Sequence, residues 1–232
     1  MRPFQEIFDQ AAAFRGGAAE LEAALAGSTP KSAKQLMAIP DDRWLSTMTR
    51  CVFQAGFNWK VIEAKWPGFE EAFEGFDVPR WAMAPDEDID RLLSDTRIVR
   101  NGQKIRTVRD NAIFLLDLAR EHGSAGKVFA EWPAEDFLGL LDLLKKHGSR
   151  LGGATAQYFL RFMGRDSFLL SRDVVAALIR DGVIDKEPTS KAAQKAVQAA
   201  FVHWMAESGR PMTHVSRVLA MSVGPTPGPA PH

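Results

Sequence analysis

The sequence predicts an all-α fold, and three observations support this. Apolar residues recur at spacings of three and four in residues 4–12, 113–118 and 137–144, as on the buried face of a helix. Segments in which apolar and polar residues alternate, as expected for strands, are absent. Helix starts and stops are clearly marked along the 232 residues. These patterns predict about ten to thirteen helices.

Proline, glycine and short polar residues place the individual helices. We expect helix starts at Pro30-Lys31-Ser32, Ile39-Pro40-Asp41-Asp42 (with Asp41 as the N-cap), Ala84-Pro85-Asp86, Trp132-Pro133 and Lys186–Ser190. We expect a break at Pro67-Gly68 after Trp66, a turn at Asn101-Gly102, and stops at His122-Gly123 and Gly209-Arg210-Pro211. A last helix should cover Met212–Met221. Residues 1–223 then form the folded domain, and the Pro/Gly-rich residues 224–232 a disordered tail.

Composition excludes several classes of protein. The chain is 46% apolar and 25% charged with a net charge of zero, which is typical of a globular protein. The single cysteine, Cys51, rules out an internal disulfide and a four-cysteine metal site. No apolar run reaches the roughly 20 residues of a membrane span. We therefore expect a cytoplasmic monomer with no cofactor, no metal and no membrane association.

Charges segregate along the chain although their sum is zero. Residues 63–95 hold ten acids and three bases, whereas residues 96–109 hold five bases and no acid. Such segregation is expected when one face of a protein meets phosphate. The alternative is a pair of solvated helix faces.

The stretch Leu143–Val175 combines a glycine-rich turn with positive charge. Residues 143–165 hold five bases and no acid, and the turn Gly148–Gly153 precedes a helix that starts at Ala154. Backbone N–H groups at a helix N-terminus suit an anion. We expect an anion to be bound by Arg150, Leu151, Gly152, Gly153 and Thr155. The alternative is a tight interhelical turn that needs glycine for a positive φ.

The segment Arg150-Leu151-Gly152-Gly153-Ala154-Thr155-Ala156, followed by Phe168–Val174, resembles the hairpin of the helix-hairpin-helix DNA glycosylases. The resemblance implies two interleaved helical lobes, a DNA phosphate held by the hairpin backbone, and a catalytic Asp one helix later. Arg150 stands where the first hairpin glycine is expected, and Ser171 where the Asp is expected, with Asp173 two residues on. Ser171 and Asp173 are therefore the catalytic candidates, and the alternative for both is an N-cap with an acid in the first turn. Ala154 stands where the strand-cutting members carry a nucleophilic Lys, so no lyase activity is implied.

A second resemblance lies upstream. The hexapeptide Gln54–Trp59, with residues 69–77 and 98–112, is similar to the DNA-3-methyladenine glycosylase I family. The resemblance implies that Trp59 lines a base pocket with Cys51, Gln54 and Asn58, and that Cys51 replaces the acid that recognises the methylated base. A core Trp59, a small buried Cys51, and backbone-bonding roles for Gln54 and Asn58 are the alternatives. The zinc ligands of that family are missing, since Val218 follows His214 where a cysteine is expected.

These resemblances imply a monofunctional DNA glycosylase. It would remove alkylated purines such as 3-methyladenine from double-stranded DNA by base flipping, in base-excision repair. Because an alkylated purine is cationic and leaves readily, a stacking pocket can supply selectivity without a strong catalytic acid. Two alternatives are a catalytically silent relative that recognises damaged or flipped bases, and a helical scaffold that does not bind DNA.

Overall fold

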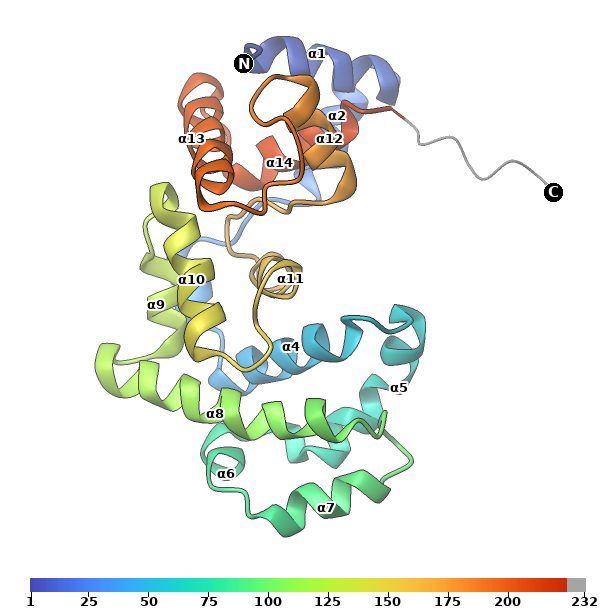
Figure 1. Cartoon of the computed structure of the whole chain (residues 1–232), viewed down its shortest axis with the longest axis vertical. Coiled ribbons are helices and arrows are strands. Elements are labelled where there is room, and N and C mark those ends of the chain that lie inside the picture. The colour runs from blue at the N-terminus through green and yellow to red at the C-terminus, as the bar shows by residue number, and fades with distance from the viewer. Residues whose placement is uncertain (225–232) are drawn as a thin grey trace, which may run out of the picture. The chain divides into compact units, whose positions relative to one another are not determined.

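The computed structural model describes residues 1–224, and every regular element in them is a helix (Figure 1). The α-helices are α1 (Phe4–Arg15), α2 (Ala18–Ala26), α3 (Ala33–Met37), α4 (Asp41–Gln54), α5 (Trp59–Ala72), α6 (Val78–Ala82), α7 (Asp86–Ser94), α8 (Gly102–His122), α9 (Ala125–Glu131), α10 (Phe137–His147), α11 (Ala154–Met163), α12 (Arg172–Arg180), α13 (Lys191–Ser208) and α14 (Met212–Met221). Two 3₁₀ turns, η1 (Glu74–Phe76) and η2 (Ala134–Asp136), precede α6 and α10. The all-α prediction is confirmed for these residues. The helices slightly outnumber the prediction because a five-residue helix such as α6 is too short to show a period.

The chain forms two compact units that are interleaved in sequence. Unit 1 consists of Met1–Pro30, Pro133–Leu138 and Asp166–His232, of which residues 225–232 lie outside the described part. Unit 2 consists of Lys31–Trp132 and Gly139–Arg165. The two ends of the chain thus build one unit and the middle builds the other, so the predicted interleaving is confirmed. The predicted disordered tail, apart from Gly224, lies outside the described residues.

Unit 1 ties the start of the chain to its last helices. The apolar stripe predicted for residues 4–12 is the buried face of α1, which packs on α2, α13 and α14. The Phe4 backbone N–H donates to the Glu207 carboxylate at 2.9 Å, and the Trp204 indole N–H donates to the Arg2 carbonyl at 3.0 Å. Asp181, with a fully buried side chain, pairs with both Arg2 and Arg180. The N-terminal segment is therefore part of the core of this unit.

Unit 2 is organised around α8, which packs against α4, α6, α7 and α9. Rings from α5, η1 and α6 stack in a continuous series of aromatic contacts, formed by Trp66, Phe69, Phe73, Phe76 and Trp81. A second aromatic group joins α4, α9 and α11 through Trp44, Phe129 and Phe159. These two groups bury the largest side chains of the unit.

The break predicted at Pro67-Gly68 is wrong, because α5 continues through both residues to Ala72. A proline inside a helix removes one hydrogen bond and is unfavourable by about 3 kcal/mol. Here the helix persists because Trp66 and Phe69, on either side of the pair, stack with ring centroids 5.0 Å apart. Gly68 allows a close backbone approach, since a Cβ there would lie 2.8 Å from the Arg97 carbonyl oxygen. Tertiary packing thus overrides the local signal.

Two further boundaries differ from the prediction. Asp41 does not cap α4: Pro40 is the N-cap, and its carbonyl accepts from the Arg43 N–H at 3.0 Å while Asp41 is the first helical residue. Asn101-Gly102 is a helix start and not a turn, since the Asn101 side chain accepts from the Lys104 N–H at 3.1 Å and Gly102 begins α8. The sequence signal is ambiguous in both segments, because the residues that favour turns also favour N-caps.

No helix in the described part of the chain is long and apolar enough to span a bilayer.

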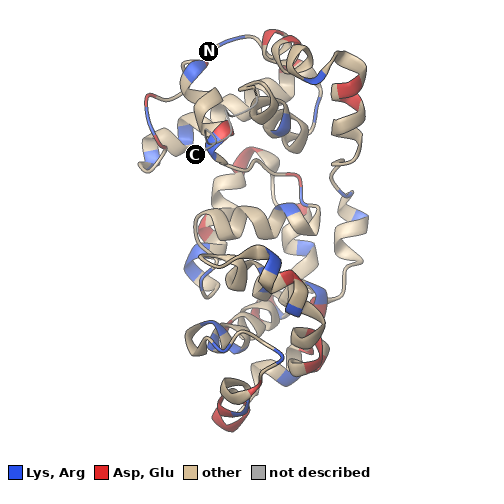
Figure 2. Ribbon diagram, turned by 90° about the vertical axis from the view of Figure 1, so that its right-hand side faces the viewer, with Lys and Arg blue, Asp and Glu red and all other residues tan. Residues whose placement is uncertain are grey.

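Figure 2 shows Lys and Arg interspersed with Asp and Glu over the ribbon of each unit. Many of these charges are paired: Arg97 with Asp95 and Glu71, and Arg109 with Asp86. The basic run 96–109 is therefore partly neutralised by the acidic run before it, and only some of its cations remain available for an anionic partner.

Candidate nucleic-acid interface

The glycine-rich turn between α10 and α11 is fixed to α8. Fully buried Asn111 accepts from the Ser149 backbone N–H at 2.7 Å and donates to the Ser149 carbonyl at 3.2 Å. The Ser149 hydroxyl donates to Asp110 at 2.9 Å. Leu151, one of the predicted DNA contacts, is fully buried. Its side chain therefore holds the turn in place and does not face solvent. The turn is therefore a rigid feature of unit 2.

The end of this turn leaves helix N–H groups available. Gly153 is the N-cap of α11, with φ +57° and no side-chain cap hydrogen bond. The first N–H groups of α11 have no intrahelical acceptor. Gly153 is exposed, and Gly152 and Thr155 are half-buried beside it. Because these donors lie at the positive end of the helix dipole, the site suits an anion such as a phosphate.

Arg150 adopts a left-handed backbone conformation, with φ +60°. This is the position where the hairpin of the resembling family has a glycine, which takes such a φ without strain. The exposed guanidinium donates to the Gln103 side chain of α8 at 2.5 Å. The substitution therefore keeps the turn geometry and adds a positive charge next to the anion site.

Trp59 opens α5 and is 40% exposed, so it is not a core residue. Its ring meets two rings of α11 edge-on, with centroids 5.0 Å from Tyr158 and 6.0 Å from Phe162. Phe162 is itself exposed, and Tyr158 is half-buried. We call Trp59, Tyr158 and Phe162 the aromatic cluster. Exposed aromatic rings that brace one another are typical of surfaces that bind a partner.

The other predicted pocket residues lie near Trp59 along α4 and the loop before α5. Asn58 is the N-cap of α5 and accepts from the Lys60 N–H at 3.0 Å. Gln54 is 3% exposed; its amide donates to Glu63 at 2.6 Å and its Oε1 has no hydrogen-bond partner. Glu63 lies one helical turn after Trp59 and also pairs with Arg50. Asn58 therefore hydrogen-bonds the backbone, which is the alternative given above to a role in a base pocket.

Cys51 carries no charge at neutral pH. It is 3% exposed, and this burial raises the pKa of its thiol to about 12. Since the thiolate would lie in an apolar environment, the protonated form is strongly favoured. Cys51 therefore cannot supply the negative charge of the acid that it replaces, which agrees with its interpretation as a small buried residue.

Ser171 and Asp173 belong to unit 1, whereas the turn and the aromatic cluster belong to unit 2. The Ser171 hydroxyl caps α12 by accepting from the Val174 N–H at 3.3 Å. Asp173 is half-buried in the first turn of the same helix. The N-cap interpretation of this pair is thus confirmed, and their catalytic role stays a prediction.

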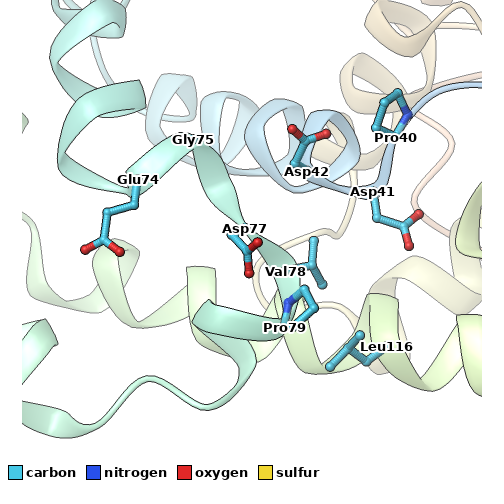
Figure 3. A pocket seen from close by; sticks show the side chains of 9 residues that line it. All are labelled: Pro40, Asp41, Asp42, Glu74, Gly75, Asp77, Val78, Pro79 and Leu116. Atoms are coloured by element: carbon cyan, nitrogen blue, oxygen red, sulfur yellow. The ribbon is translucent and has the colours of Figure 1, made fainter.

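An acidic cavity of about 410 Å³ lies elsewhere in unit 2 (Figure 3). It is lined by Pro40, Asp41, Asp42, Glu74, Gly75, Asp77, Val78, Pro79 and Leu116. Burial, together with the neighbouring Asp42 carboxylate, raises the pKa of Asp41. Four carboxyl groups repel phosphate, and none of the predicted site residues lines this cavity. It is therefore not part of the predicted site.

The zinc ligands implied by the resemblance do not fit this chain. His214 and Val218 both lie on α14, and Val218 is fully buried and apolar where a cysteine thiolate would be needed. Within residues 1–224, no group of three or more His, Cys, Asp or Glu side chains is arranged to hold a metal ion.

Sequence reasoning missed three residues of this region. Phe57 and Phe162 are exposed aromatics, and Lys104 is a buried lysine beneath the loop that carries Phe57. A partial signal exists for Phe162, because it follows Tyr158 by four residues, outside the buried stripe of α11. Lys104 has no such signal, since its acceptors lie about fifty residues away in sequence.

The fold of the chain is that of a solved DNA glycosylase. The structure of the 8-oxoguanine glycosylase/lyase of Methanocaldococcus jannaschii, solved with DNA, superposes with a TM-score of 0.51 at 13% identity, covering 93% of this chain and 95% of that one. Residues 38–136 match the model of the methyladenine glycosylase family, somewhat less than half of the chain. The resemblance to the methyladenine glycosylases seen in the sequence is thus confirmed over this segment.

Two methyladenine glycosylases give the extent of the similarity. DNA-3-methyladenine glycosylase 1 of Escherichia coli K12 is 34% identical over 59 residues, which are 25% of this chain and 32% of that protein. The chain therefore matches about a third of the length of this curated relative. The structure of 3-methyladenine DNA glycosylase I from Staphylococcus aureus has a TM-score of 0.47 at 23% identity, covering 53% of this chain and 76% of that one.

Proposed function

We propose that this protein is a monofunctional DNA glycosylase that excises alkylated purines, 3-methyladenine above all, in base-excision repair. The observation that carries the proposal is Trp59, which is exposed in the segment that matches the methyladenine glycosylase family and is braced by Tyr158 and Phe162. A cationic purine stacks on an indole with an added cation–π attraction. A buried base must first leave the duplex, so the substrate is a flipped nucleotide.

The proposed partner is double-stranded DNA, held at the turn before α11. The uncapped N-terminus of this helix, with exposed Arg150 and Lys145 beside it, would hold one phosphate of the backbone. Phosphate contacts position the duplex without reading its sequence. Because the net charge is zero, we expect few phosphate contacts and a modest dependence of binding on salt.

The proposed chemistry is hydrolysis of the N-glycosidic bond. The sugar develops oxocarbenium character, which a nearby carboxylate stabilises. Asp173 is the candidate for that carboxylate, and Ser171 is the candidate that positions the water. An alkylated purine leaves without strong acid catalysis, so the demand on these two residues is low. Ala154, at the position of the family's nucleophilic Lys, agrees with a monofunctional enzyme.

The test is release of 3-methyladenine from methylated duplex DNA by purified protein. We expect Trp59→Ala to lower kcat/KM about 10- to 100-fold, since stacking on an aromatic side chain contributes about 1–3 kcal/mol per base. Asp173→Asn should lower kcat with little change in duplex affinity. Folding of each variant is checked by its thermal unfolding. If folded wild-type protein binds the duplex but releases no base above the buffer rate, the enzymatic proposal fails.

A second candidate function is a catalytically silent protein that recognises damaged or flipped bases. Two observations favour it: the neutral, buried Cys51 offers no negative charge, and the Ser171 hydroxyl is occupied as an N-cap. This protein would bind a duplex with an abasic-site analogue more tightly than undamaged duplex, and would release no base. The same pair of measurements therefore separates the two candidates.

A further inference from the structure

Lys104 is a buried cation that none of the roles above uses. It is 6% exposed and lies in the first turn of α8, where its own backbone N–H is capped by Asn101. Its ammonium donates to the Phe53 carbonyl at 3.2 Å and to the Ala55 carbonyl at 2.6 Å. These carbonyls belong to the last turn of α4 and to the residue after it, where helix carbonyls lack intrahelical donors. Lys104 therefore closes the C-terminal end of α4.

The same ammonium also holds an aromatic side chain of the following loop. Its Nζ lies 4.5 Å from the ring centroid of Phe57, within the range of a cation–π contact. Phe57 is 41% exposed, so one part of the ring faces solvent while another covers the ammonium. Residues 55–58 connect α4 directly to Trp59, the first residue of α5. Lys104 thus fixes both the backbone and a side chain of the segment that leads into the aromatic cluster.

Lys104 also lies next to Gln103, which contacts Arg150 of the glycine-rich turn. Gln103 precedes it on α8 and accepts from the Arg150 guanidinium. Burial, and then the positive charge of Arg150, lower the pKa of Lys104. An anion bound at the turn would offset the charge of Arg150 and so remove part of the repulsion on the Lys104 ammonium. The charged side chain of Lys104 would then be less unfavourable at its position beside the Phe53 and Ala55 carbonyls.

We propose that Lys104 is a positioning residue that fixes residues 55–59 and links their order to occupation of the turn by an anion. The inference rests on the proposed function, since it takes a DNA phosphate as that anion. The linkage is reciprocal: a segment ordered by Lys104 favours anion binding, and anion binding favours the ordered segment. Undamaged DNA at the turn would therefore order the aromatic loop before a lesion is reached.

The experiment compares amide hydrogen exchange at residues 55–59 in the full chain, free and with undamaged duplex. In the wild type we expect slower exchange when duplex is added. Lys104→Met keeps the methylene chain but removes the charge, and should exchange about tenfold faster in this segment in both states. Lys104→Arg should restore part of the protection. Lys65→Met is the matched control, since Lys65 also donates to a backbone carbonyl, that of Thr96 at 2.9 Å, and should behave as the wild type.

Kinetics and a measurement on the wild type complete the test. On methylated duplex, Lys104→Met should lower kcat while duplex affinity changes less than about threefold. If the variant does not fold, the ¹⁵N signal of the wild-type Lys104 ammonium decides: a hydrogen-bonded ammonium gives a slowly exchanging signal that shifts when duplex is added. Wild-type exchange at residues 55–59 in Lys104→Met, or an ammonium signal that duplex does not shift, overturns the proposal. If the wild type binds no duplex, the proposed function fails. Comparing amide exchange in the free wild type and the free Lys104→Met variant still tests whether Lys104 orders residues 55–59.

Discussion

Replacing Arg150 by glycine or by alanine should give two variants that differ in stability but share the same loss of DNA binding. The left-handed backbone of Arg150 is unfavourable by about 1–2 kcal/mol for any residue with a Cβ. Glycine removes that strain but adds about 0.5–1 kcal/mol of chain entropy to the unfolded state. Relative to Arg150→Ala, which loses the same Gln103 hydrogen bond and keeps the strain, Arg150→Gly should thus be more stable by about 0.5–1 kcal/mol.

The loss of charge should weaken DNA binding equally in both variants. Each phosphate contact contributes about 0.9 to the slope of log K against log salt for duplex DNA. Fluorescence titrations of a labelled duplex over a salt series should therefore give a slope about 0.9 smaller for both variants than for the wild type. Arg120→Ala serves as the control, because Arg120 is 77% exposed and lies at the C-terminal end of α8, whereas Arg150 contacts Gln103 at the N-terminal end. This variant should leave the slope unchanged.

Urea unfolding monitored by tryptophan fluorescence gives the stability difference, provided that the m-values of the variants agree. If Arg150→Ala is as stable as Arg150→Gly, the backbone of this turn is not held in the left-handed region. If both variants keep the wild-type salt slope, Arg150 does not contact phosphate. The two results are independent, so the conformational and the electrostatic parts of the reasoning are tested separately.

Two further predictions concern buried groups of unit 2. Burial alone would raise the pKa of Glu70, but hydrogen bonds from Arg43, Ser46 and Trp66 hold it below its usual value; Glu70→Gln should therefore lower the free energy of unfolding by about 2–3 kcal/mol at neutral pH. Because the folded-state pKa is lowered, this difference should be complete above about pH 5 and shrink as the pH falls through the folded-state pKa; a difference that does not vary with pH in urea titrations contradicts the assignment. The Cys51 thiol, with its pKa raised to about 12, should react with a thiol reagent at mildly alkaline pH at least about a hundredfold more slowly than in urea-unfolded protein; equal rates would show that the thiol is accessible.

Local sequence signals predicted the helices well where a boundary depends only on neighbouring residues. Ser32, Ser171 and Ser190 each cap the helix that the sequence placed after them. Prediction failed at Pro67-Gly68, because the packing that keeps α5 intact involves Phe69 and the backbone of Arg97, and neither contact is visible in the local pattern. The boundary errors thus follow from long-range contacts that outweigh local preference.

The candidate site was predictable in part for the same reason. Trp59, Gly152 and Gly153 were identified from short motifs, and all three are accessible to solvent. The contacts that support them come from remote segments: Tyr158 lies ninety-nine positions after the tryptophan that it touches. A single sequence gives the identity of a motif residue, whereas the residues that orient it become visible only when the chain is folded.

The interleaving of the two units has a consequence for synthesis. Unit 2 needs no residue after Arg165, so all of its sequence is available while the last part of the chain is still on the ribosome. Residues 1–30 are made before their partners on α13 and α14, and until those helices emerge only α2 can cover the apolar face of α1. Nascent chains that stall after Arg165 would carry a folded unit 2 and an α1 whose apolar face is only partly covered, which is the kind of segment that chaperones bind.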